Sequence, residues 1–387
     1  MPTDPHARYI GQNVVYWRKR RGRSQRALAG LAGISQPYLS YIERGIKGVD
    51  SRALEAKLAN ALEISVADLT AQPGTPADPA RTTAAAHIPA IREALLRREL
   101  GDRGTPDPTL DRLIAAGGAY DFATAAPLIP NLILGLNGAD FVQASYFVGY
   151  TLKHLGHPDL AMASARLAVA EARELGDPAW IGIGEYIRVH AMPMEMPDAP
   201  TALAKRIADE IQPHTGDPRV RQAYGMLHLY AALRSAIDGK RPLAVDHLTE
   251  ARQAADSLGE PTGLGHAKFA FGPTNVGFWE TGIRLELREP RQALDAARRV
   301  DPTLIPVANR QAPFYADVAT ALAQIGKDQE AIATFLRSEA IGPQWFRLRP
   351  TVSDTIGVII RRTKRNALST QMRSAAVATN QRQLLND

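Results

Sequence analysis

Residues 25–45, QRALAGLAGISQPYLSYIERG, decide the fold of the N-terminal part of this 387-residue chain. Ser24 stands where an N-cap is needed, and Gly33 follows the first helix because glycine accepts the left-handed backbone at a helix C-terminus. Ser35 then caps a second helix, which Gly45 terminates. The stretch therefore predicts two short helices joined by a tight turn.

The second helix, at about 36–44, has two different faces when each residue is turned by about 100°. Leu39 and Ile42 point inward, and Ala29 of the first helix is small enough to let the two helices cross closely. The outward face is polar, aromatic and basic, and the one acid, Glu43, lies off to the side. This pattern predicts a helix-turn-helix whose second helix enters the major groove of DNA. An ordinary amphipathic helical hairpin is the alternative.

The motif resembles the lambda-repressor-like (XRE) helix-turn-helix family in a fixed frame of residues. The matching positions are Arg18, Gly22, Gln25, Leu28, Ala29, Gly33, Ile34, Ser35, Leu39, Ser40, Ile42, Glu43 and Gly45. The resemblance implies that Glu43 pairs with Arg18 inside the domain and that Gln25 bonds a phosphate. Pro37 replaces a polar base-reading residue that is common in the family, so direct readout is expected to be thinner here.

The expected DNA contacts come from the outward face of the second helix, from the start of the first, and from the loop after Gly45. Basic residues near these helices favour phosphate contacts, and free amides of the loop 46–50 are expected to contribute with Lys47. The full set of expected DNA-binding residues is Arg23, Ser24, Gln25, Arg26, Ser35, Gln36, Pro37, Ser40, Tyr41, Arg44 and Lys47.

The net charge of +6 is concentrated at the N-terminus. Residues 1–70 hold 11 Lys and Arg against 6 Asp and Glu, whereas the remaining residues hold 35 against 34. A basic excess confined to one domain favours a polyanionic partner such as DNA. The chain has no cysteine, no signal-peptide pattern and no apolar run of membrane-spanning length, so we expect a cytoplasmic protein without disulfides.

The chain divides into two domains and a linker. Residues 1–71 are expected to form the helix-turn-helix domain, with further helices at 5–21 and 51–62 and a capping box at 65–68 that opens a fifth helix. The Pro/Gly-rich stretch around 72–81 is the linker. Residues 82–387 form the second domain, which begins with a helix at about 82–99.

The second domain is all-helical and carries an imperfect repeat. Segments at 158–178, 199–211, 242–261, 290–302 and 328–343 each predict the second helix of a pair, and equivalent alanines recur at steps of 43, 40, 49 and 38 residues. These alanines are Ala161, Ala204, Ala244, Ala293 and Ala331. The expected partner helices lie at 139–155, 178–192, 217–238, 274–288 and 309–325.

This pattern resembles degenerate tetratricopeptide (TPR-like) repeats, although no unit carries the full consensus, and an irregular helical bundle is the alternative. The order of parts resembles a family of actinobacterial transcriptional regulators. The segments that carry this resemblance are YLSYIERGIKGVDSRAL (38–54), DPARTTAAAHIPAIREAL (78–95) and FGPTNVGFW (271–279). A looser resemblance links the chain to quorum-sensing regulators that bind signal peptides.

Motifs of enzyme chemistry are not found, and we expect no enzymatic activity, no cofactor and no metal. His154 and His157 lie three residues apart but have no third ligand in frame. The glycine-rich segment 259–275 lacks the GK[ST] of a phosphate loop, so it is interpreted as a long connection with a helix start at Pro273 and Thr274. The basic run 361–365 is a solvated helix face, or alternatively a second contact with DNA or an acidic partner.

A signal-binding site is expected on the concave face of the repeats, because helical-repeat proteins hold extended peptides with polar amides and aromatic pockets. Candidate ligand-binding residues are Tyr150, Tyr186, Tyr224, His228, Asn275, Trp279 and Asn309, with Tyr146 and Tyr315 as further candidates. The alternative for each is a core aromatic residue or a helix cap.

The sequence as a whole predicts a dimeric, DNA-binding transcriptional regulator that senses a peptide or a small molecule through its repeats. Dimerisation is expected because one small helix-turn-helix buries too little surface for tight specific binding. A protein-interaction scaffold that uses the helix-turn-helix for docking, without sequence-specific DNA binding, is the alternative.

Overall fold

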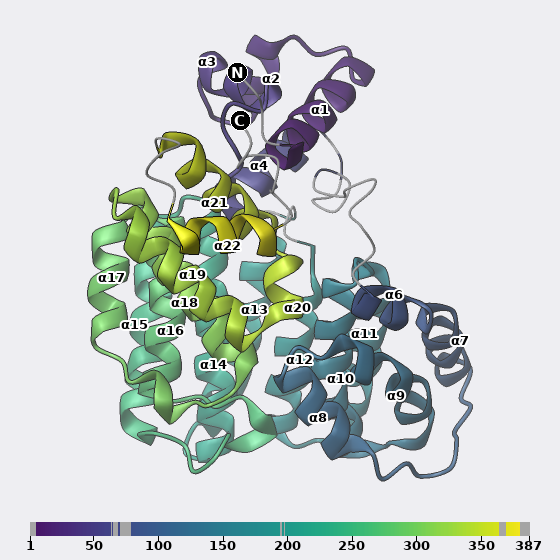
Figure 1. Cartoon of the computed structure of the whole chain (residues 1–387). Helices are drawn as coiled ribbons and strands as arrows, with labels where there is room; N and C mark the ends of the chain where they lie inside the picture. Colours follow the sequence, from purple (N-terminus) through teal and green to yellow (C-terminus); the bar gives the residue numbers. More distant parts are fainter. Residues whose placement is uncertain are drawn as a thin grey trace.

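The computed structural model describes residues 5–62, 64, 69, 79–193, 196, 198–363 and 369–379. Within these ranges the secondary structure is entirely helical, which confirms the predicted all-α class. Figure 1 shows the N-terminal helices packed above a large array formed by the rest of the chain. In the part of the chain that is described, no helix is long and apolar enough to cross a bilayer.

The four described helices of the N-terminal domain lie where the sequence predicts them. They are α1 (Pro5–Arg20), α2 (Gln25–Leu31), α3 (Gln36–Glu43) and α4 (Arg52–Leu62). Their apolar faces share one core, in which Ile10, Val14, Leu28, Leu39 and Leu58 are almost fully buried. The predicted capping box at 65–68 lies outside the described residues, and Leu69 just beyond it is buried in the same core.

The prediction of one continuous helix over 82–99 is wrong. Two helices occupy this region, α6 (Pro79–Ala85) and α7 (Ile88–Glu99), and α6 begins inside the predicted linker. Pro89 explains the break, because proline has no N–H to donate and its ring clashes with the carbonyl four residues earlier, that of Ala85.

The predicted helix pairs of the second domain are all present. They are α10 (Gly138–His154), α11 (Pro158–Leu175), α12 (Pro178–Ala191), α13 (Ala199–Ile211), α14 (Pro218–Ile237), α15 (Arg241–Leu258), α16 (Pro273–Glu286), α17 (Pro290–Arg298), α18 (Ala308–Gln324) and α19 (Asp328–Ile341). The five recurring alanines are all fully buried. The helix start predicted at Pro273 is confirmed as well.

Additional helices complete the array at both ends: α8 (Leu110–Gly118), α9 (Phe122–Gly135), α20 (Pro343–Arg347), α21 (Pro350–Arg362) and α22 (Thr370–Ala378). The first helices of successive pairs (α8, α10, α12, α14, α16 and α18) each contact the next one. Helix α18 in turn contacts α8, so these helices form a closed inner ring.

Hydrogen bonds join the first and last parts of the ring. The Tyr120 hydroxyl donates to the carbonyl of Asn309 at 3.3 Å, and the Gln344 side chain bonds both the backbone N–H of Phe122 and the carboxylate of Asp121. The repeats therefore surround an interior instead of offering the open concave face that the sequence predicts.

Candidate functional site

The turn between α2 and α3 is fixed by its caps. The Ser24 hydroxyl accepts a hydrogen bond from the Ala27 N–H at 3.1 Å, and the Ser35 hydroxyl accepts one from the Tyr38 N–H at 3.3 Å. Gly33 has the left-handed conformation that ends α2, with φ of 63°. These local interactions set the direction of α3 relative to α2.

A buried ion pair locks α3 onto α1. The Arg18 guanidinium bonds both carboxylate oxygens of Glu43, at 2.6 and 3.0 Å, and Gln25 donates to the same carboxylate at 2.7 Å. The Arg18–Glu43 pair implied by the family resemblance is thus present. The Gln25 amide takes part in this internal network, and the carboxylate of Glu43 is withdrawn from the surface.

The outward face of α3 is exposed and lacks an acidic side chain. Leu39 and Ile42 are buried, as predicted, whereas Tyr41 keeps 40% of its surface exposed and Arg44 is exposed beside it. The Arg44 guanidinium lies 5.1 Å from the centre of the Tyr41 ring, and the Lys47 ammonium lies 4.9 Å from that of Tyr38. Cation–π contacts of this kind hold two positive charges over the outer end of the helix.

Most of the remaining predicted contacts surround this face. Exposed members of the set are Ser24, Arg26, Ser35, Gln36 and Pro37, and Ser40 is half-buried. Arg23 is turned toward the domain, where it donates to the carbonyl of Ala61.

Three of the five loop amides that the sequence predicts to be free are bonded within the protein. Those of Ile46 and Lys47 donate to the Tyr41 carbonyl, and that of Val49 donates to Asp354 in α21. The loop is hydrogen-bonded to α3 and to the helical array. Of the DNA contacts predicted for this loop, the Lys47 side chain is exposed.

Residues 16–72 match the protein-family model described as a helix-turn-helix domain. The match covers the capped turn, the buried ion pair and the exposed α3 face, which supports reading these residues as one DNA-binding unit. No curated protein and no solved structure matches the chain.

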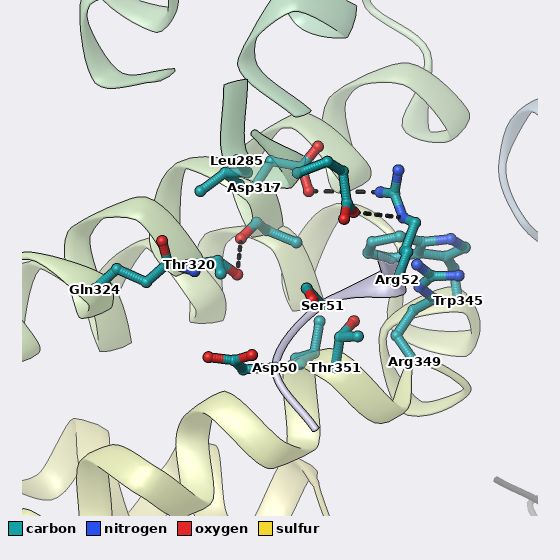
Figure 2. Close-up of a pocket in the computed structure, with 13 residues that line it drawn as sticks. Asp50, Ser51, Arg52, Leu285, Asp317, Thr320, Gln324, Trp345, Arg349 and Thr351 are labelled. Carbon is teal, nitrogen blue, oxygen red and sulfur yellow. Dashed lines mark hydrogen bonds and ion pairs between the residues drawn. The ribbon is translucent and has the colours of Figure 1, made fainter. Parts of the chain in front are cut away.

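The helix-turn-helix domain docks on the helical array through the start of α4. The Glu286 carboxylate of α16 accepts a hydrogen bond from the Ala53 N–H at 3.1 Å, so a side chain of one domain caps a helix of the other. Arg52 lies 3.6 Å from Asp317 of α18, and Arg288 donates to the Ser51 hydroxyl at 3.1 Å. Figure 2 shows Arg52 reaching toward Asp317, with Trp345 and Arg349 beside it.

An apolar contact and a buried acid complete this docking surface. Ala53 and Ala56 of α4 pack against Ile237 of α14. Glu55 is 8% exposed, and burial raises its pKa to about 7 despite the positive charge of Arg349 nearby. The adjoining polar pocket has a cavity volume of about 30 Å³, room for about two water molecules.

Several predicted ligand-binding residues meet in the interior of the ring. The Tyr120 and Tyr150 hydroxyls lie 2.6 Å apart, and the Tyr146 ring centre lies 6.3 Å from that of Tyr186. Asn275 is fully buried in α16, and Asn309 supplies the carbonyl that bonds Tyr120. These predicted residues therefore come together from α10, α12, α16 and α18.

Other predicted ligand-binding residues lie elsewhere. Tyr224 donates to Glu250 of α15 at 3.0 Å, and His228 lies 3.1 Å from His247, which is also on α15. Both residues therefore contact the outer layer. Tyr315 belongs to a small separate cluster, with Arg337 over its ring. Trp279 is half-buried against the main core. The geometry does not assemble these residues with the interior group.

Arg310 is an interior residue that sequence reasoning missed. The residue is 9% exposed. Its guanidinium donates to the Tyr146 hydroxyl at 3.0 Å and to the Phe269 carbonyl at 3.3 Å, and pairs with no carboxylate among the described residues. The nearby histidines are neutral, since burial lowers the pKa of His154 to about 3 and that of His190 well below its ordinary value.

The basic run at 361–365 is only partly described. Arg362 forms an ion pair with Asp328 and donates to the Ala323 carbonyl at 2.8 Å. Its guanidinium is thus used within the array, and residues 364–365 lie outside the described residues.

Proposed function

We propose that this chain is a transcriptional regulator of the lambda-repressor-like (XRE) class that binds DNA in a sequence-specific way. In this proposal α3 lies in the major groove, with Gln36, Ser40 and Tyr41 toward base edges or backbone and Arg44 and Lys47 toward bases or phosphates. The observation that carries the proposal is the exposed, acid-free face of α3 on a domain that matches a helix-turn-helix model.

The orientation of the domain supports this function. Docking on the helical array uses α4, the loop before it and α1, and the outward residues of α3 stay exposed. Glu43 is paired with Arg18, which removes the charge that would repel phosphate most directly. Arg44 and Lys47 then leave this face with two positive charges.

Binding to duplexes selected from a random pool tests the proposal. Replacing Lys47 by alanine should reduce the slope of log affinity against log salt by about 0.9 for each phosphate that the protein no longer neutralises. Replacing Arg44 by alanine should weaken binding by about 1–3 kcal/mol and relax specificity at one position. The matched control is Arg298→Ala, which removes an exposed charge on α17. Equal effects of Arg44→Ala and the control would reject the proposal.

The second part of the proposal concerns dimerisation and signalling. We propose that the helical domain, built of TPR-like pairs, forms a dimer and binds a peptide or small molecule that shifts the spacing of two DNA-binding domains. A contact path supports coupling: Tyr120 stacks on Trp345 at 5.6 Å, Arg349 lies over Trp345, and Arg349 interacts electrostatically with Glu55 of α4. Sedimentation that shows only monomers, with and without selected DNA, would reject the dimer.

A further inference from the structure

The connection between α15 and α16 enters the ring in a strained conformation. Ala267, Lys268 and Ala270 all have positive φ, of 49°, 59° and 51°. A left-handed conformation disfavours residues with a Cβ by about 1–2 kcal/mol each. Such strain persists only where surrounding contacts impose it, and it concentrates at functional sites.

Side chains of the inner ring hold the backbone of this connection. The Gln222 amide donates to the His266 carbonyl at 2.5 Å and accepts from the His266 N–H at 3.3 Å. The Phe269 carbonyl accepts hydrogen bonds from Arg310 at 3.3 Å and from Asn275 at 3.5 Å. Paired donors and acceptors on main-chain groups are how a protein holds a peptide whatever its side chains.

Two aromatic side chains of the connection fill the interior. The Phe269 ring centre lies 5.0 Å from those of both Tyr146 and Tyr186. Phe271 packs on Gly225 of α14, where an added Cβ would lie 2.0 Å from the phenyl ring. Side chains that bond the backbone of the connection and residues that pack on its aromatic rings therefore occur together. They come from α10, α12, α14, α16 and α18.

Two side chains that bond the Phe269 carbonyl have further hydrogen-bonding atoms that are not used within the described part of the chain. The Nε of Arg310 and the Oδ1 of Asn275 are buried and have no hydrogen-bond partner among the described residues. A buried guanidinium without a carboxylate is unfavourable, and a carboxylate placed beside it forms a charge-assisted pair. The carbonyl of Phe269 already lies where one oxygen of such a carboxylate would lie.

We propose that residues 264–271 are a tethered, peptide-like occupant of the interior, and that the domain's signal is a short peptide with an aromatic C-terminal residue. The ring of that residue takes the place of Phe269, and its free carboxylate pairs with Arg310. This inference rests on the proposed sensing function and specifies its ligand class. Strain in the tethered segment favours the exchange, because displacement relaxes Ala267, Lys268 and Ala270.

The test uses the peptide LGHAKF, residues 264–269, with an N-terminal fluorophore and a free C-terminal carboxylate. Anisotropy titrations should show at least tenfold tighter binding to the full chain carrying Phe269→Ala than to the unaltered chain. Amidation of the C-terminus should weaken binding to Phe269→Ala at least tenfold, and adding Arg310→Gln should abolish this difference. Equal binding of the acid and amide peptides, or no binding to Phe269→Ala with unchanged circular dichroism, would overturn the inference.

A second variant keeps the test informative if Phe269→Ala folds poorly. Lys268 is exposed, so Lys268→Gly relieves backbone strain without removing a buried ring. The more stable tethered segment should then weaken binding of the free peptide by at least threefold, and stronger binding would overturn the inference. DNA affinity is measured separately on the same proteins, so a failure of DNA binding counts against the proposed function alone.

Discussion

Glu55 is a buried acid at the junction of the two domains, and replacing it by glutamine should stabilise the chain most at high pH. Burial is the main cause of its raised pKa, Glu286 raises the pKa further, and Arg349 and Arg52 oppose the rise. The protonated carboxyl is therefore the form that the folded chain prefers. Glutamine has nearly the same shape and stays neutral at every pH.

The size of the effect follows from the pKa values of Glu55 in the unfolded and folded chain, 4.5 and about 7. Because the folded pKa is the higher one, the folded chain binds more protons between these values, and stability is lost as pH rises through that window. The loss due to Glu55 is about 1 kcal/mol at pH 5 and about 3 kcal/mol at pH 8. The stability gained by Glu55→Gln should therefore grow by about 2 kcal/mol between these pH values.

Urea unfolding of the full chain at pH 5, 6, 7 and 8 measures this difference. The matched control is Glu174→Gln, which makes the same substitution at an exposed acid on α11. Glu286 repels the Glu55 carboxylate, so part of the pH-dependent gain in Glu55→Gln comes from relief of this repulsion, and Asp317 is unchanged in both proteins. A stability difference between Glu55→Gln and the unaltered chain that is constant from pH 5 to pH 8 would refute the reasoning.

Three further substitutions test the packing. Glu43→Ala leaves the Arg18 guanidinium without its carboxylate and should destabilise the domain by about 3 kcal/mol in urea unfolding, with Glu43→Gln less harmful. Gly225→Ala forces a methyl group against the Phe271 ring, so the melting temperature should fall by the equivalent of about 1–3 kcal/mol. Ala244→Leu overfills a fully buried helix crossing and should raise the unfolding rate, and an unchanged rate would contradict the tight packing there.

Local signals are enough to predict most of the helices. Ser24, Gly33, Ser35 and Gly45 mark the helix ends of the N-terminal motif, because capping and left-handed turns depend on neighbouring residues alone. The recurring alanines mark the helix pairs for a similar reason, since close crossings require small side chains. The break before Pro89 is a local signal too, but the apolar pattern of 82–99 continues across it and favours a single helix.

The interior site is harder to predict because it depends on contacts between distant parts of the chain. Arg310 and Tyr146 are 164 residues apart, and nothing local distinguishes this arginine from a solvated one. Tyr224 and His228 lie on an inner helix, as predicted, but their side chains point to the outer layer. Which face of α14 turns inward depends on the rotation of this helix about its axis, and a single sequence does not determine that rotation. The role of Phe269 is hidden for another reason, because its glycine-rich segment has the composition of a simple connection.

Closure of the inner ring also bears on how the molecule is made. Helix α8 ends at Gly118, but its neighbours on the far side, α18 and α20, end at Gln324 and Arg347. At the usual pace of a ribosome these partners emerge about 10–40 s later. During synthesis the aromatic side chains around Tyr120 lack these partners for that time. Nascent chains of this protein should therefore depend on chaperones that shield such surfaces.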